Sequence, residues 1–352
     1  MPITIAVFIG VLAGLILAHE LGHFITAKAS GVLVKEFGIG FPPRLLSVKH
    51  GETIYSLNAI PLGGFTKMAG EEDPEASRSL AGKPIRTRLL VLSAGSLMNI
   101  ILPLLLFSIA FMVPHNVVEG QIIITDVAHN SPAAIAGVEP GDTLLSINGK
   151  SIHNISDLHR YIQLNLGSEI TMLVQHSDST TEEALVTPRW QPPEGQGPVG
   201  ITINMLDPTV ITVQESPLRA VPLAASASIE TFMLFKNGIM TMIIGAVPVE
   251  VTGPVGIAQL TGMVARAGFS PLMEFAAFLS INLALINIFP LPGLDGGRIV
   301  FVLLEAIRRG KRVSPKTEGR VHFIGFIALI GTIMVITYQD IIRIMSGGSA
   351  IP

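Results

Sequence analysis

The sequence contains no cysteine. Disulfide bonds, thiolate metal ligands and a cysteine nucleophile are therefore excluded, and a bound metal ion must be held by His, Asp or Glu. Charged residues are also scarce, because they make up 14% of the chain, against roughly 25% in soluble domains. The net charge of −3 gives no concentrated basic face, so we expect no nucleic-acid partner.

Apolar residues dominate instead. They account for 49% of the chain, and the mean hydropathy is +0.58, which is typical of a polytopic α-helical membrane protein. A span needs roughly 20 mostly apolar residues, and such runs predict about four transmembrane helices, at residues 1–27, 89–113, 272–297 and 322–340. The first run lacks a basic n-region and an Ala-x-Ala cleavage site, so we expect a retained helix and not a removable signal peptide.

The first apolar run ends in His19-Glu20-Leu21-Gly22-His23. On a helix, residues i and i+4 share a face, so both imidazoles can bind one zinc ion while Glu20 reaches a metal-bound water. This spacing is a metalloprotease signature, and here it lies within a predicted span. The alternative is a plain membrane anchor that carries the motif by chance.

A catalytic zinc site with two histidines needs a third protein ligand, and Asp295 is the best candidate. It follows two prolines and is flanked by glycines, within residues 287–298. Irregular backbone at membrane depth is expected only where it is covered by protein or lines a functional cavity. The alternative is an ordinary turn at the membrane surface.

Three connecting segments are less apolar. Residues 28–88 show β-like alternation broken by turn signals, which predicts a hairpin in a cytoplasmic or membrane-associated loop. Residues 206–270 are interpreted as an interfacial helix and a Gly-rich connector, because Glu230 and Lys236 interrupt the apolar pattern. Residues 298–321 form a basic cytoplasmic loop.

The stretch from 117 to 205 has the composition of a soluble domain. Its strands, short helices and turns include NSPAAIAGVEPGDTLLSINGKSI, which resembles a PDZ domain of the bacterial protease type. The resemblance implies an inserted α+β domain that binds extended peptides or free C-termini by strand addition. The alternative is a spacer or gate whose groove stays empty.

HELGH in the first span together with NxxPxPxLDGG near the end of a later span is the paired signature of the site-2 protease family of intramembrane zinc metalloproteases. The resemblance extends over nearly the whole chain, through the PLGGF loop, the GxxxN second span, the GPVGI passage and the last span. The order matches bacterial members with a single PDZ insert.

The resemblance implies roles for six residues. His19, His23 and Asp295 would bind Zn²⁺, and Glu20 would be the general base that activates the zinc-bound water. Asn99 and Asn287 match asparagines that hold the substrate backbone or the developing oxyanion. Both amides have the alternative role of joining helices by hydrogen bonds.

Charge asymmetry predicts the orientation. Nine basic residues lie between residues 28 and 88, and seven between 298 and 320, so both loops are expected in the cytoplasm, with both termini and the PDZ domain outside. His19 lies about 25 Å along a helix from Pro2, hence in the cytoplasmic half of the membrane. The family resemblance implies the inner (plasma) membrane of a bacterium.

We therefore expect regulated intramembrane proteolysis of single-span membrane proteins or peptides, of the anti-sigma factor or remnant signal peptide type. The alternative from another class is a non-catalytic membrane adaptor that holds partners through its PDZ domain. An adaptor has no need for the complete set of His19, Glu20, His23 and Asp295. A transporter is a weaker alternative, because no inverted repeat of spans is apparent.

Overall fold

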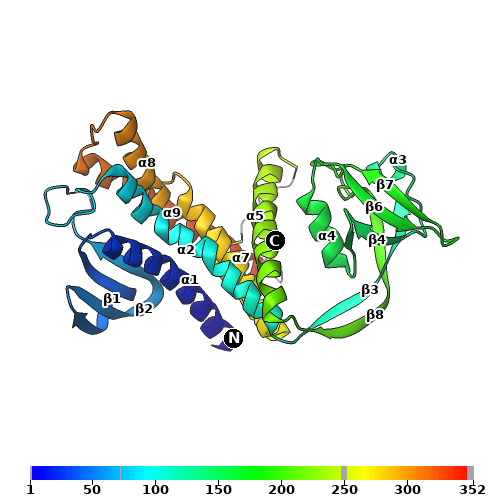
Figure 1. Cartoon of the computed structure of the whole chain (residues 1–352), viewed down its shortest axis with the longest axis horizontal. Helices are drawn as coiled ribbons and strands as arrows, with labels where there is room; N and C mark the ends of the chain where they lie inside the picture. The colour runs from blue at the N-terminus through cyan, green and yellow to red at the C-terminus, as the bar shows by residue number, and fades with distance from the viewer. Residues whose placement is uncertain (1, 72, 247–251, 347–352) are drawn as a thin grey trace. The chain divides into compact units, whose positions relative to one another are not determined.

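The computed structural model describes residues 2–71, 73–246 and 252–346. These residues form two compact units. The helical unit comprises the described residues of 1–110, 217–225 and 250–352, and the strand-rich unit comprises those of 111–216 and 226–249. Each unit is described by itself below (Figure 1).

The helical unit is built from six helices and a long β-hairpin. The helices are α1 (Pro2–Ala29), α2 (Ile85–Met112), α6 (Pro254–Ala267), α7 (Phe269–Ile288), α8 (Asp295–Ile307) and α9 (Pro315–Met345). The hairpin consists of β1 (Val34–His50) and β2 (Thr53–Met68), which lie beside α1 (Figure 1). A further helix, α5 (Pro217–Ile243), begins in this unit and continues into the strand-rich unit.

Five of these helices are long and apolar enough to cross a membrane: α1, α2, α5, α7 and α9. The sequence analysis expected about four, so α5 is an additional candidate by length and composition. Glu230 and Lys236 in the sequence favour an interfacial helix here, and α5 is the least apolar of the five. Residues 247–251, at the end of that expected segment, lie outside the described residues.

The expected hairpin is present, but its strands fold back on one another, which the alternation of apolar and polar residues does not predict. The first part of β1 pairs with both arms of β2, so that Phe37 lies opposite Tyr55 on one side and Thr66 on the other. The arm ending at Met68 is therefore one edge of a small twisted sheet, and residues 44–50 form the other.

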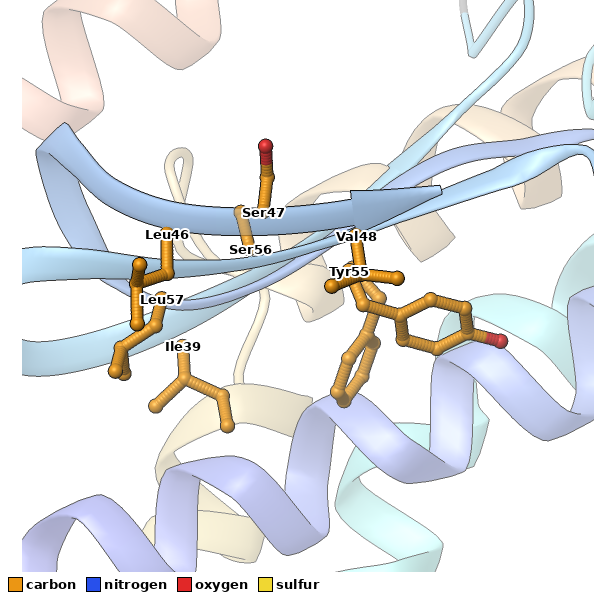
Figure 2. A pocket seen from close by; sticks show the side chains of 8 residues that line it. Ile39, Leu46, Ser47, Val48, Tyr55, Ser56 and Leu57 are labelled. Carbon is orange, nitrogen blue, oxygen red and sulfur yellow. The ribbon is translucent and has the colours of Figure 1, made fainter. Parts of the chain in front are cut away.

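One face of this sheet carries an open apolar pocket of about 310 Å³. Ile39, Leu46, Leu57 and Tyr55 project from this face, while Ser47 points the opposite way (Figure 2). Leu46 pairs with Leu57 across the strands, and both side chains are exposed. An apolar face of this kind suits the predicted membrane-associated position.

The strand-rich unit is an antiparallel sheet with the strand order β7-β6-β4-β3-β8, and β5 pairs with β4. Its strands are β3 (His115–Val127), β4 (Thr143–Ile147), β5 (Lys150–Ser151), β6 (Ile170–Gln175), β7 (Thr181–Val186) and β8 (Ile201–Val213). The helices α3 (Pro132–Ile135) and α4 (Ile155–Leu164) and the part of α5 from residue 226 onward complete it. The alternating inward residues of the strands and Leu158 of α4 form one apolar core.

Two segments interpreted as connectors contain helices. The Gly-rich connector within 206–270 holds α6, and the basic loop 298–321 begins with most of α8 and ends with the first turns of α9. The start of α6 is capped from a distance, because the Asp340 carboxylate of α9 accepts hydrogen bonds from the backbone N–H groups of Gly253 and Gly256. A local sequence pattern does not contain this acceptor, so the helix start was missed.

Candidate metal centre

α1 presents both histidines of HELGH on one buried face. His19 is 7% exposed and His23 is 5% exposed. His23 Nδ1 lies 2.8 Å from the carbonyl oxygen of Val91 on α2. A carbonyl only accepts, so Nδ1 donates its proton there, and in the neutral imidazole Nε2 then carries the lone pair that can bind a metal ion. The helices approach closely at Gly22, where an added Cβ would meet the carbonyl oxygen of Ala94.

Asp295 reaches the histidines because the chain breaks its helical course between α7 and α8. Asp295 is the first residue of α8, and Gly293 just before it has φ +99°, a left-handed conformation that favours glycine. Gly296 and Gly297 lie against the backbone carbonyls of Phe289 and Leu291, so neither position has room for a Cβ. The Pro- and Gly-rich sequence thus folds α8 back tightly on the end of α7.

The three expected ligand atoms converge in the folded chain. Asp295 Oδ2 lies 3.0 Å from His19 Nε2 and 3.0 Å from His23 Nε2, and the two Nε2 atoms are 3.2 Å apart. Asp295 is 272 positions from His23 and 276 from His19 in sequence, and the three residues form a group that could hold a metal ion. The structure therefore brings together all three residues proposed as ligands.

The donor set fits zinc. Imidazole nitrogens and carboxylate oxygens are common zinc ligands, and catalytic zinc sites typically have three protein ligands. Space for an ion is provided by Gly95 of α2, because a Cβ there would lie 2.6 Å from His19 Nε2 and closer still to His23 Nε2. Among the described residues, His19 Nδ1 is buried without a hydrogen-bond partner.

Glu20 lies beside the hairpin. Its side chain is half-buried, and a Cβ on Gly64 of β2 would lie 3.2 Å from its Cγ. Thr66 Oγ1 donates a hydrogen bond of 3.1 Å to the carbonyl oxygen of Glu20. The edge arm of β2 therefore contacts α1 at the proposed general base.

Asn99 lies on the same face of α2 as Val91 and Gly95, at intervals of four residues. It is fully buried, and neither its Nδ2 nor its Oδ1 has a hydrogen-bond partner among the described residues. Its backbone oxygen accepts a hydrogen bond from Ser280 of α7, so the backbone, and not the side-chain amide, makes the contact between the helices.

Asn287 lies in the last turn of α7, eight residues before Asp295, and is half-buried. Within the part of the chain that the structure describes, its side chain makes no hydrogen bond or ion pair. Sequence reasoning missed the Val91 carbonyl, Gly95 and Gly64, which complete the surroundings of the site. The small residues of GxxxN and PLGGF indicate that another segment approaches the backbone closely at these positions, but they do not identify that segment.

The class of protein follows from this site and from comparison with known proteins. The model of Peptidase family M50 matches residues 7–332. A protein of Clostridium perfringens named as a zinc metalloprotease is 37% identical over 94% of this chain and 96% of its own. The regulator of sigma-W protease RasP of Bacillus subtilis is 28% identical over 97% of this chain and 99% of its own.

This chain belongs to Peptidase family M50, the site-2 protease family. It is a multi-pass membrane zinc metalloprotease. A solved PDZ domain of the SdrC-like protein from Listeria innocua covers 24% of this chain and 93% of its own length, with 22% identity and a TM-score of 0.21. That likeness does not by itself define a fold.

Proposed function

We propose that this protein cleaves single-span membrane substrates within the bilayer, with zinc held by His19, His23 and Asp295 and with Glu20 as general base. The observation that carries the proposal is the convergence of three potential ligand atoms within 3.2 Å of one another. Both histidines are buried and lie on α1, which is long and apolar enough to span a membrane. A membrane adaptor has no use for this arrangement.

A bound zinc ion supplies Lewis-acid chemistry, which polarises a peptide carbonyl and makes water more acidic. Glu20, one position beyond His19 on the helix, accepts the proton of the attacking water and later gives it to the leaving amine. The carboxylate thus carries one proton from water to product and ends the cycle ionised. Because Glu20 is half-buried and lies beside Gly64, its carboxylate can reach both solvent and a substrate bound along β2.

The edge arm of β2 is suited to hold the substrate. A helical substrate has its backbone carbonyls hydrogen-bonded, so it must unwind locally before attack. Gly64 to Met68 pair with β1 on one side, and an extended substrate segment can add along the other. The buried side-chain amide of Asn99, which has no hydrogen-bond partner among the described residues, is assigned to bind the substrate backbone or the oxyanion. Asn287 is assigned the same role by family resemblance.

The directions of the helices support the predicted orientation. The start of α1 contacts α6 at Thr4 and Gly262, and α6 directly precedes α7. α1 and α7 therefore both run toward the metal centre, whereas α2 runs away from it beyond Gly95. The segment between α2 and α7 leaves and returns at the same side of the membrane.

α5 is consequently assigned as a helix that does not cross the bilayer. One crossing by α5 would need a second crossing before α7, and α6 has only 14 residues. At 1.5 Å per residue it is about 21 Å long, shorter than the ~30 Å hydrocarbon core. With four spans, both termini and the strand-rich unit lie outside, and the metal centre lies toward the cytoplasm.

The strand-rich unit is assigned as the PDZ-like domain that screens substrates. β8 pairs only with β3 among the described strands, so its other edge is available to an extended peptide or a free C-terminus. A relative named as a regulator of sigma-W favours anti-sigma factors as the substrate class, with remnant signal peptides as the second class.

The test is cleavage of a model single-span substrate by the purified full-length protein in detergent. Glu20→Gln is expected to retain zinc and to cleave at least about 100-fold more slowly, because general acid–base catalysis is lost. Glu194→Gln, an exposed carboxylate in the strand-rich unit, is the matched control. Loss of zinc in Glu20→Gln, or undiminished cleavage, would contradict the assigned role, and wild type with neither zinc nor cleavage would contradict the proposed function.

A further inference from the structure

α8 carries a buried ion pair at the end opposite to Asp295. Arg88 Nη1 of α2 donates a hydrogen bond of 2.5 Å to Glu305 Oε2 of α8, and each residue is only 7% exposed. Arg312 approaches the other carboxylate oxygen, with its Nε 3.1 Å from Glu305 Oε1, and also donates to the carbonyl of Ala81. The pair joins residues 217 positions apart.

The charges of this pair compensate one another. Burial opposes the ionisation of Glu305, but the hydrogen bonds and charges of Arg88 and then Arg312 outweigh it and hold the pKa of Glu305 below its ordinary value. Removing one partner leaves an uncompensated buried charge. The geometry of the contact between α2 and α8 is therefore closely tied to Arg88 and Glu305.

Both helices also reach the metal centre. α2 carries Val91, whose carbonyl fixes His23, and Gly95, which makes room beside the ligand nitrogens. α8 carries Asp295, ten residues before Glu305, or about 15 Å along the helix. Val91 and Leu92 of α2 and Val302 of α8, which lie in sequence between the ion-pair residues and the metal-centre residues of their helices, belong to one buried apolar cluster.

The first turn of α8 is tied down separately. Arg298 Nη1 donates a hydrogen bond of 2.6 Å to Glu71 Oε2, and Glu71 Oε1 accepts from the backbone N–H of Met68 at the end of β2. α8 is thus held to the hairpin next to Asp295 and to α2 at its far end. Two attachment points and an apolar contact fix both the rotation and the register of a helix.

We propose that Arg88 and Glu305 are positioning residues for the protease reaction, which set the place of Asp295 relative to His19 and His23. This inference rests on the proposed function, because it requires these three residues to bind zinc. Neither Arg88 nor Glu305 touches the ligand atoms, so the pair acts through α2 and α8. Loosening it weakens zinc binding and slows the chemical step, while substrate binding at β2 is unchanged.

The test compares Arg88→Met with Arg86→Met in the full-length protein. Arg86 lies two residues earlier on α2 and is exposed, so the two variants remove the same charge from the same turn. Zinc affinity is measured against a competing chelator, and kcat and KM are measured at saturating zinc. Arg88→Met is expected to bind zinc about tenfold more weakly, at the lower end of the effect of outer contacts on metal sites. A fall in kcat with KM within about twofold is expected to accompany it, and Arg86→Met should match wild type.

Two milder variants separate positioning from loss of folding. Arg88→Lys keeps the charge but not the geometry of the guanidinium, and Glu305→Gln keeps the shape but not the charge. Both are expected to retain the wild-type elution volume in size-exclusion chromatography, yet to change the visible absorption spectrum of the cobalt-substituted protein. The proposal would be overturned if these two variants matched wild type in zinc affinity, in kcat and in the spectrum of the cobalt-substituted protein.

The outcome is distinguishable from failure of the proposed function. If wild type binds no zinc and cleaves nothing, the assignment of the metal centre is wrong, and the positioning role fails with it. If wild type is an active zinc protease and Arg88→Met equals Arg86→Met, only the positioning role is wrong. Arg88→Met alone leaves the Glu305 carboxylate without its buried partner, and the double variant Arg88→Met/Glu305→Met removes that charge as well. If the double variant folds as well as wild type but still binds zinc more weakly, the result supports a positioning role.

Discussion

Gly95 shows how one residue without a side chain supports the metal centre. It lies on α2 between Val91 and Asn99, at the point where the helix passes the ligand nitrogens. A methyl group there would meet both Nε2 atoms, 2.6 Å from that of His19 and closer to that of His23. No movement of the flexible end of a long side chain relieves this contact, because the imidazoles are fixed by α1 and by the Val91 carbonyl.

Gly95→Ala is therefore expected to abolish cleavage and to reduce zinc affinity by about tenfold or more, a loss of at least 1.4 kcal/mol. Alanine favours helix by about 1 kcal/mol over glycine, so weakening of α2 does not explain such a loss. Gly14→Ala in α1 is the matched control, because nothing lies within 4 Å of its added Cβ. Equal zinc content and activity in both variants would contradict the predicted steric role.

At this scale the sequence is enough to propose the three ligands. The i, i+4 spacing of His19 and His23 depends only on helix geometry, and Asp295 stands out as a carboxylate within a broken span. The supporting groups were not predictable in the same way. A backbone carbonyl such as that of Val91 has no sequence signature, and its contact with His23 spans 68 residues.

α5 shows how an element can satisfy a membrane criterion and still have a polar role. Its residues from 226 onward belong to the strand-rich unit. Glu230 is only 8% exposed, with its carboxylate 2.8 Å from Lys150 Nζ and 2.8 Å from Arg160 Nη2. Asn237 donates a hydrogen bond of 2.7 Å to the carbonyl of Gln163 in α4. Glu230, one of the two charged residues that interrupt the apolar pattern, thus attaches α5 to α4 and β5, together with Asn237.

Glu230→Ala is expected to loosen this attachment by about 1–2 kcal/mol, because Lys150 and Arg160 lose their shared partner but remain partly solvated. In hydrogen exchange of the full-length protein, the amides of α4 and of α5 beyond residue 226 should then exchange about tenfold faster. Lys236→Ala, at an exposed position of the same helix, is the control. Unchanged protection in Glu230→Ala would show that the ion pairs do not hold the helix.

At the scale of the whole molecule, the topology depends on the number of membrane crossings. α5 meets the length and composition criteria of a span. The proposed topology, in which α2 runs away from the metal centre and α7 returns to it, requires an even number of crossings between these two helices. An interfacial or docked α5 gives four spans and places both termini on one side. If α5 crossed the membrane and no second segment crossed back before α7, the end of α7 and Asp295 would lie on the opposite side from the histidines. The distances of 3.0 Å from Asp295 to His19 and His23 contradict this.

The absence of cysteine allows this to be measured with single-cysteine variants and a membrane-impermeant maleimide. Ser216→Cys and Ile244→Cys flank α5 at exposed positions, and both should be labelled from outside the cell. Ser77→Cys and Lys311→Cys, also exposed, should be labelled only after permeabilisation. Labelling of Ser216→Cys and Ile244→Cys from opposite sides would show that α5 crosses the membrane.

The sequence by itself determined the membrane class, four of the apolar helices, the hairpin and the two motifs that carry the proposed ligands. Each of these is encoded by local periodicity or by neighbouring residue types, which act over a few residues of chain. Only the tertiary structure decided that 254–267 and 295–307 are helices docked on other elements, that α5 attaches through Glu230, and that Asp295 meets His19 and His23. The cap on α6 comes from Asp340, and the anchor of α8 comes from Arg88. These contacts join residues far apart in the chain, and their energy depends on packing that no local pattern contains.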